Sequence, residues 1–551
     1  MKNLYKAAWM TGLLAVATGC TNLDPILKDD VVAGNFLNTP ADYAAAVATP
    51  YQQLTNLSQW HWLVMDHTSD ALTIYTHQSG WNNDRHRRTD THELLESDNK
   101  RFPLGGTMWS PIFDGIAKTN GAIEFLKGGD PDIAAPYLAE LRALRGFYYL
   151  LGMDAYGGMP IVEAAAPTPG TLPERNTAVE VFEFITSEFE EVIPLLPSKG
   201  DADFPGFPRI SKEAAQGILA LVYLNGEVYT RSDFAQPGSG TTYYDEALEL
   251  IDEIIDGGQF GLVSNYAAMF DVDNETQEQE FLFYVDHKTG ITGGAVGYPI
   301  WSLTLEWVEA WTGNLGLNSA NGPAVEPAFF RYYLDHPNYQ NDKRFLFNPE
   351  TQEGNFLYGV QYTPAGDTLK DTQGRIIDHS IDFYLRPQDG PADYQALYEG
   401  VRIIKWWPDP TGIDRQADNG FPIIRYADLL LMKAEIILRK KGATSVNGVI
   451  DDAITDPMAD ELVNMVRERA FDDYEPLTGV TLLDVYDERG LELYAEAAHR
   501  RRDQIRFDTH HIARESWQTA QGPEFDRYKS LFPVPGDERA ANPNLWQNTG
   551  Y

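Results

Sequence analysis

The feature that most constrains the fold is a series of amphipathic helical segments separated by breaks that contain glycine and proline. Apolar side chains recur every three or four residues, the spacing that places them on one face of a helix. No strong strand pattern lies between these segments, so we predict stacked antiparallel helical pairs. The first three segments are marked by Leu138, Leu141, Leu144, Tyr148 and Leu151, by Val181, Ile185, Phe189 and Val192, and by Ile218, Leu221 and Val222.

Start and stop signals bound several helices. The segment 39–42 (TPAD) combines an N-cap threonine, a proline at the first helical position and a capping acid. Thr177 with an acid three residues later, and Ser211, predict two further helix starts. A helix over about 245–255 is expected to end at the glycine pair Gly257-Gly258.

The middle of the chain has a different character. Residues 274–421 are rich in Gly, Pro, Asn and aromatic side chains, and β-like pieces such as 401–404 are short. A second irregular stretch runs from about 60 to 106. We therefore predict a mainly α fold in which a helical scaffold supports a large, loop-rich lobe. Helical spacing returns at 109–126 and resumes after the lobe at 425–439, 460–470 and 482–499.

Composition excludes some classes of protein. The chain has 551 residues, a formal net charge of −38 and a single cysteine. A field of this sign repels phosphate backbones, so we expect no nucleic-acid partner. With one cysteine no intrachain disulfide can form, and packing alone must hold the fold.

The single cysteine, Cys20, follows a short apolar stretch, 7–17, that is preceded by Lys2 and Lys6. The stretch is too short to span a bilayer, and small residues lie directly before Cys20. The pattern resembles a bacterial lipoprotein signal. We predict that residues 1–19 are removed, that Cys20 is lipidated, and that 20–33 form a tether to the membrane.

Several segments, in one order along the chain, resemble the SusD/RagB-like family of Bacteroidetes outer-membrane lipoproteins. They are 109–120 (WSPIFDGIAKTN), 141–150 (LRALRGFYYL), 156–161 (YGGMPI), 425–435 (RYADLLLMKAE), 463–470 (VNMVRERA), 487–494 (DERGLELY), 532–535 (FPVP) and 542–551 (NPNLWQNTGY). The resemblance implies a tetratricopeptide-like scaffold, a location on the outer membrane facing the cell exterior, and a SusC-like TonB-dependent barrel as partner.

On this basis we divide the mature chain into three parts after the tether. The first is a helical scaffold over 34–273 with binding loops inserted at about 60–106. The second is the irregular lobe over 274–421. The third, 422–551, supplies C-terminal helices that complete the scaffold.

The motifs of enzymes are mostly missing from the sequence. The segment 92–96 (HELLE) ends in Glu where a zinc protease needs a second histidine, and no G-x-S-x-G or phosphate-loop pattern occurs. Adjacent His510 and His511 make a poor metal site alone. Asp66 and Asp70 are the carboxylate pair we would test for glycosidase chemistry, although turn or cap roles are favoured. We predict no enzyme activity, no cofactor and no metal site.

Exposed aromatic rings beside amide and charged groups suit sugars, which offer apolar C–H faces and hydroxyl edges. A turn-rich segment supplies this set in Trp81, Asn82, Asn83, Asp84 and Arg85. Trp301 and Trp311 form a second candidate group, whereas Trp109 is expected to pack inside and the Trp406-Trp407 pair ranks lower because a strand precedes it.

The predicted function is therefore capture of an oligosaccharide or polysaccharide for delivery to the SusC-like barrel. A neutral glucan such as a β-glucan is preferred because the acidic chain repels anionic polymers. Two alternatives stay open: a peptide receptor of the RagB type and, less favoured, a surface glycosidase.

Overall fold

The computed structural model describes residues 33–74, 88–97, 108–166, 170–272, 274–288, 322–363, 365–371, 373–383, 398–408, 417–512 and 524–551. Cys20, the signal segment and nearly all of the tether lie outside this part of the chain. Within it, no helix is both long and apolar enough to cross a membrane.

The described part is mainly helical. Its helices are α2 (Ala33–Phe36), α3 (Pro40–Ala46), α4 (Ala48–His67), α6 (Trp109–Leu126), α7 (Pro131–Tyr156), α8 (Ala178–Val192), α9 (Lys212–Leu224), α10 (Gly226–Tyr229), α11 (Tyr244–Gly257), α14 (Pro327–Asp335), α15 (Tyr426–Lys440), α16 (Pro457–Glu468), α17 (Leu482–Glu492), α18 (His499–Arg506) and α19 (Gly536–Ala541). The mainly α prediction is confirmed.

Strands are short and form only two-stranded pairs among the described residues. They are β1 (Leu72–Ile74), β2 (Phe281–Val285), β3 (Pro323–Val325), β4 (Phe356–Leu357), β5 (Gly359–Val360), β6 (Asp378–His379), β7 (Arg402–Ile403), β8 (Phe421–Arg425), β9 (Ser445–Val446) and β10 (Val449–Ile450). The β-like character predicted at 401–404 is confirmed by β7.

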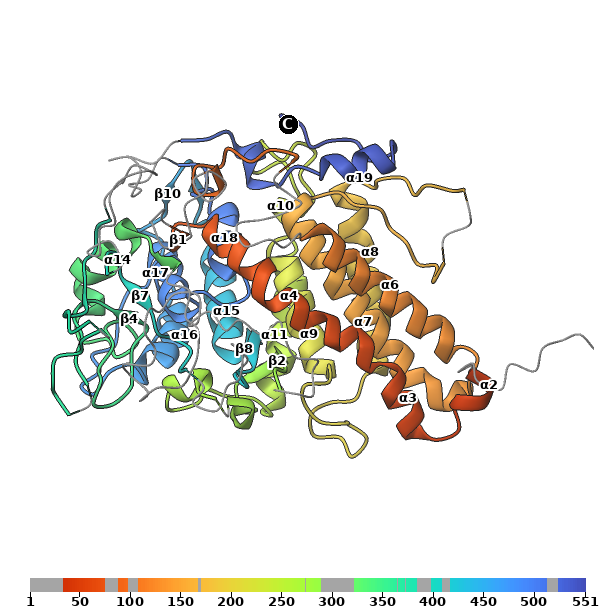
Figure 1. Cartoon of the computed structure of the whole chain (residues 1–551), viewed down its shortest axis with the longest axis horizontal. Coiled ribbons are helices and arrows are strands. Elements are labelled where there is room, and N and C mark those ends of the chain that lie inside the picture. The colour runs from red at the N-terminus through yellow and green to blue at the C-terminus, as the bar shows by residue number, and fades with distance from the viewer. Residues whose placement is uncertain are drawn as a thin grey trace, which may run out of the picture.

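Neighbouring helices pack as pairs, most extensively α6 with α7, α7 with α8, α9 with α11, and α15 with α16. In Figure 1 helices α3, α6, α7 and α8 occupy one end of the molecule and α14, β4 and β7 the other, while α4 runs from the first end toward β1. Helices α15 to α18 lie between them, so residues from the end of the sequence complete the body that the first helices begin.

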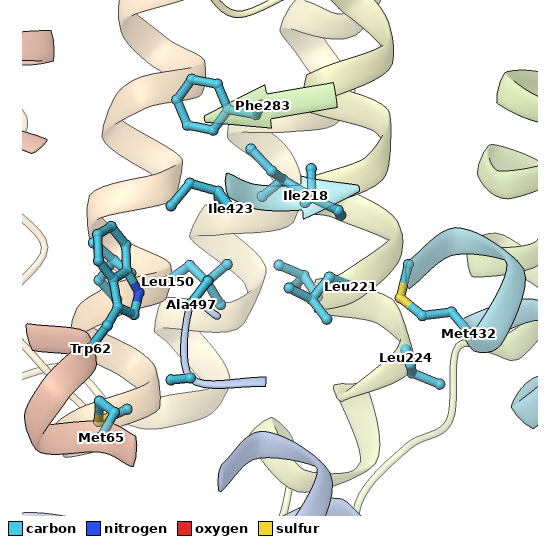
Figure 2. Close-up of a cluster of buried hydrophobic side chains, with 14 of the residues drawn as sticks. Trp62, Met65, Leu150, Ile218, Leu221, Leu224, Phe283, Ile423, Met432 and Ala497 are labelled. Atoms are coloured by element: carbon cyan, nitrogen blue, oxygen red, sulfur yellow. The ribbon is translucent and has the colours of Figure 1, made fainter. Parts of the chain in front are cut away.

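One hydrophobic core connects both halves of the sequence. Figure 2 shows side chains from α4, α7, α9, α15, β2 and β8 converging. Each of the labelled residues is at most 3% exposed: Trp62, Met65, Leu150, Ile218, Leu221, Leu224, Phe283, Ile423, Met432 and Ala497. Strand β2 pairs antiparallel with β8, and this pair ties the irregular region to the helices.

Helix starts follow the cap signals. The Asp42 carboxylate accepts a hydrogen bond from the backbone N–H of Thr39 at 2.7 Å. A capping box joins Thr177 and Glu180, and the Ser211 hydroxyl oxygen accepts from Ala214 N at 3.1 Å. Each side chain satisfies a donor that the first helical turn leaves unpaired.

Two boundaries differ from the prediction. The irregular stretch expected from residue 60 begins later, because α4 continues to His67. The helix expected over 482–499 is two helices, since α17 ends at Glu492 and α18 begins at His499. Between them Ala495, Ala497 and Ala498 have φ of 52°, 42° and 61°, the left-handed region that alanine rarely adopts.

The physical reason for this break is a buried charge. The left-handed turn directs Glu496 inward, where its carboxylate lies 2.7 Å from Arg425 and 2.6 Å from Lys405. Arg500, four residues after Glu496, does not bind this carboxylate but pairs with Asp70. Tertiary ion pairs therefore override the strong helix preference of the alanines.

Glu492 is the centre of the same buried network. It lies 2.9 Å from Arg425, 2.6 Å from Arg469 and 2.8 Å from Arg344. Burial alone would raise the pKa of Glu492, but the three guanidinium charges overcome this effect and lower it. The carboxylate thus stays ionised and joins β8, the end of α16 and the irregular lobe to α17.

The basic run 500–502 also pairs internally. Arg500 binds both Asp70 carboxylate oxygens, at 2.7 and 2.8 Å. Arg501 donates to the Thr68 hydroxyl at 2.9 Å, and Arg502 lies 2.6 Å from Asp154. The three arginines fasten α18 to α4 and α7.

Replacing Arg425 with methionine should destabilise the fold by about 3–5 kcal/mol, because three buried carboxylates lose a shared cation. Urea unfolding measures this loss. The control is Lys127→Met, which removes an exposed pair with Glu124 and should change stability by less than about 1 kcal/mol. Equal, small effects from both variants would contradict the role given to the network.

Candidate ligand-binding site

The sequence-predicted binding residues all fall in two segments outside the described part of the chain. Trp81, Asn82, Asn83, Asp84 and Arg85 belong to 75–87, and Trp301 and Trp311 belong to 289–321. The structure therefore does not place their side chains. It does place the points at which these two segments join the scaffold.

Strands β1 and β3 form an antiparallel ribbon in which Ile74 is paired with Pro323. Segment 75–87 leaves directly after Ile74, and only Gly322 separates segment 289–321 from Pro323. Both segments are thus attached at one end of the same ribbon. We call this end, formed by Ile74 and Pro323, the ribbon end.

A third segment, 384–397, is connected to the ribbon by Phe383, directly before it, and by Val401, four residues after its end. Phe383 packs against Ala324 of β3. On the other side of the segment, the carbonyl oxygen of Val401 accepts a hydrogen bond from Val325 N at 3.0 Å. Three chain segments that are distant in sequence therefore share one attachment region.

The ribbon is held from beneath by buried hydrogen bonds. The Ala71 carbonyl oxygen accepts from Glu326 N at 3.1 Å and from the Tyr494 hydroxyl at 3.0 Å. The Thr73 hydroxyl donates to Asp90 at 3.1 Å. All three β1 residues are buried. Such support fixes the backbone from which the candidate segments leave.

Asp66 and Asp70 occupy structural positions. Asp70 forms the bidentate pair with Arg500 described above. Asp66 is 2% exposed on α4, and burial raises its pKa from 3.8 to about 7 against the opposing charges of Arg502 and Lys405. A glycosidase acid must reach a sugar, which the burial of Asp66 prevents.

The histidines singled out in the sequence also pack into the body. His92 stacks on Phe525 with ring centroids 3.9 Å apart. His510 lies 2.7 Å from both the Ser530 hydroxyl and the Thr68 carbonyl oxygen. Among the described residues, no group of three or more His, Cys, Asp or Glu is arranged to hold a metal ion.

The remaining tryptophan predictions can be compared with the structure. Trp109 is 5% exposed and packs on Phe113 and Tyr156, so its predicted core role is confirmed. Trp406 is 3% exposed and stacks on Phe421. The lower rank given to the 406–407 pair agrees with this burial.

Sequence reasoning missed a cleft of about 360 Å³ beside α4. Its wall is mostly apolar, with Tyr51 and Tyr284 among its residues, and Asp286 at its edge. Burial raises the pKa of Asp286, partly opposed by Lys288. The lining comes from three distant segments, so no local pattern in the sequence could reveal it.

These features define a protein of paired helices that carries an irregular lobe, with the two candidate segments attached at one supported ribbon. Comparison with known proteins gives the class a name. Residues 332–551 match a model described as the SusD family, and 37–224 match one described as starch-binding associating with outer membrane. The chain belongs to the SusD/RagB-like family, as the sequence motifs predicted.

Individual relatives are distant. A SusD-like protein of Formosa agariphila is 24% identical over 501 residues, which is 84% of this chain and 83% of that protein. A SusD homolog from Bacteroides thetaiotaomicron has a similar structure with a TM-score of 0.68 and 19% identity, over 94% of this chain and 98% of that one.

Two further similar structures are of proteins described by the glycan that they bind. Surface glycan-binding protein A from B. thetaiotaomicron, in complex with laminarihexaose, has a TM-score of 0.66 and 20% identity, over 93% of this chain and all of that one. A laminarin binding SusD-like protein has a TM-score of 0.65 and 18% identity, over 93% and 99% of the two chains. These likenesses establish the shared fold.

Asp66→Asn should raise the melting temperature at pH 8 and leave it nearly unchanged at pH 4. The folded-state pKa of Asp66 lies above 3.8, so the contribution of Asp66 to stability falls as pH rises from about 4 to about 7 and then stays level. Asparagine cannot ionise, so the variant lacks this pH dependence of stability. Melting temperatures of both proteins between pH 4 and 8 measure the difference.

Asp70→Asn is the contrasting variant, because it leaves the buried side of Arg500 without its carboxylate and should lower the melting temperature. If both variants lost the same stability at pH 8, the raised pKa assigned to buried Asp66 would be wrong.

Proposed function

We propose that this chain is a non-catalytic surface lipoprotein that captures a neutral oligosaccharide or polysaccharide. The observation that carries the proposal is the pairing of Ile74 with Pro323, since it attaches two segments rich in sugar-binding side chains to one point. Family membership and the laminarin and laminarihexaose ligands of similar structures support a glycan, and a β-glucan in particular.

We assign the contacts with the glycan to segments 75–87 and 289–321. Trp81 and the tryptophans Trp301 and Trp311 supply apolar platforms for sugar rings. Around Trp81, the polar residues Asn82, Asn83, Asp84 and Arg85 supply hydrogen bonds to hydroxyl groups. A neutral ligand suits the formal net charge of −38, which disfavours anionic polymers.

Capture is followed by delivery to a SusC-like TonB-dependent transporter in the outer membrane. The family description "associating with outer membrane" supports this location. Lipidated Cys20 would hold the chain at the membrane facing the exterior. In this import the chain binds the glycan and holds it beside the transporter. The burial of Asp66 supports a role without glycan hydrolysis.

Trp81→Ala should weaken binding of laminarihexaose about tenfold, a loss of about 1.4 kcal/mol, because a ring platform is removed. The melting temperature should not change. Isothermal calorimetry measures the affinity, with Tyr362→Ala as control, since Tyr362 is an aromatic residue 45% exposed in another part of the chain.

A panel of neutral and acidic polysaccharides tests the ligand class in the same assay. Absence of binding to every glycan, together with co-purifying peptides identified by mass spectrometry, would replace the glycan receptor by the RagB-type peptide receptor. Release of reducing ends that Asp66→Asn abolishes would instead require the glycosidase.

Cys20→Ser should release the chain from the membrane fraction, because the hydroxyl cannot carry the thioether-linked lipid that anchors a lipoprotein. Fractionation of cells followed by detection of the chain measures this shift. A serine variant that stays in the membrane fraction as fully as the wild type would contradict lipid anchoring at this residue.

A further inference from the structure

A polar groove of about 420 Å³ lies at the end of α14, away from the ribbon. Helix α14 starts two residues after β3, and its last turn contributes Tyr333 and Leu334 to the groove. Nine helical residues span about 13 Å, so the groove is separated from the ribbon by roughly one short helix. Its volume falls within the range of small-ligand sites.

The floor of the groove is apolar and tightly packed. Tyr333, Tyr339 and Phe345 are 1%, 4% and 4% exposed. Behind them Arg344 binds both oxygens of Asp342, at 3.0 and 2.6 Å, and also reaches Glu488 and Glu492. The buried charge network therefore anchors this turn to α17 and organises the groove before any ligand arrives.

The rim at the opening of the groove is lined by polar side chains, several of which have hydrogen-bonding atoms available for a ligand. Asn341, Thr351 and Glu353 make no side-chain hydrogen bond with the residues that the structure describes. The Gln340 amide nitrogen donates to Leu334 O at 2.8 Å, and its amide oxygen accepts nothing from that same part of the chain. Donors and acceptors thus line the opening together.

The chemistry of the rim selects the kind of ligand. Lys343 is paired with Asp472 at 2.9 Å, and Glu353 adds a further negative charge. This balance disfavours anions. Leu346, which is 42% exposed at the groove, offers an apolar surface of the kind that covers sugar C–H faces. Amides, a hydroxyl and aliphatic surface together fit a neutral polyhydroxylated molecule.

We infer that this groove is a second saccharide subsite, which binds a neutral sugar unit of a glycan at a distance from the ribbon end. The inference rests on the proposed glycan-binding function. A polymer that occupies both sites gains affinity because the second contact is intramolecular. The groove would therefore matter more for laminarin than for laminarihexaose.

The test uses the mature chain with Cys20→Ser and the double variant Asn341→Gly/Leu346→Ala. Asn341 has φ of 65°, which glycine adopts freely, so the substitution removes the amide and keeps the backbone. The matched control is Gln352→Gly/Ile376→Ala. Gln352 has φ of 59°, Ile376 is 50% exposed, and neither lines the groove.

Calorimetry with laminarin should show at least fivefold weaker binding for the groove variant and a change below twofold for the control. Occupancy of the groove is measured with an environment-sensitive dye attached to Glu350→Cys. The dye labels only this position, because Cys20, the chain's single cysteine, has been replaced. Laminarihexaose should change its fluorescence saturably, including in a Trp81→Ala background.

Wild-type affinity for laminarin retained by the groove variant, with no dye response to laminarihexaose, would overturn the subsite and leave the proposed function intact. A wild-type chain that binds neither probe would contradict the β-glucan function and the subsite together.

Discussion

The buried arginine–carboxylate network around Glu492 holds the parts of this molecule in one arrangement. An ionised carboxylate in a protein core is costly unless cations surround it. Here Arg344, Arg425 and Arg469 reach it from the irregular lobe, from β8 and from the end of α16. Moving any one of these segments would separate a buried charge from its partner, so the network fixes their relative positions.

This arrangement explains how an irregular lobe can support recognition. Tyr494, two residues beyond Glu492, donates to the Ala71 carbonyl oxygen beneath β1. The same charge network that fixes α17 therefore also supports the ribbon, at the end opposite to Ile74 and Pro323. Arg344 fixes the groove beyond α14. Segments rich in loops can vary in sequence when their attachment points are fixed by a rigid scaffold.

Local sequence signals predicted much of the scaffold and little of the site. The caps at Thr177 and Ser211 and the whole of α6 followed from short patterns, because helix termini and helical faces depend on neighbouring residues. The break before His499 did not, since buried ion pairs with distant arginines override alanine's helix preference. The groove residues lie almost entirely within 333–353 but carry no periodic signal, and the structure leaves Trp81 unplaced.

The central claim is that glycans bind where 75–87 and 289–321 join the scaffold. Hydrogen exchange of the Cys20→Ser chain, with and without saturating laminarihexaose, tests it most directly, because ligand contact slows exchange of nearby backbone amides. We predict slower exchange in peptides from both segments. Unchanged exchange in both, while the sugar binds, would contradict the account.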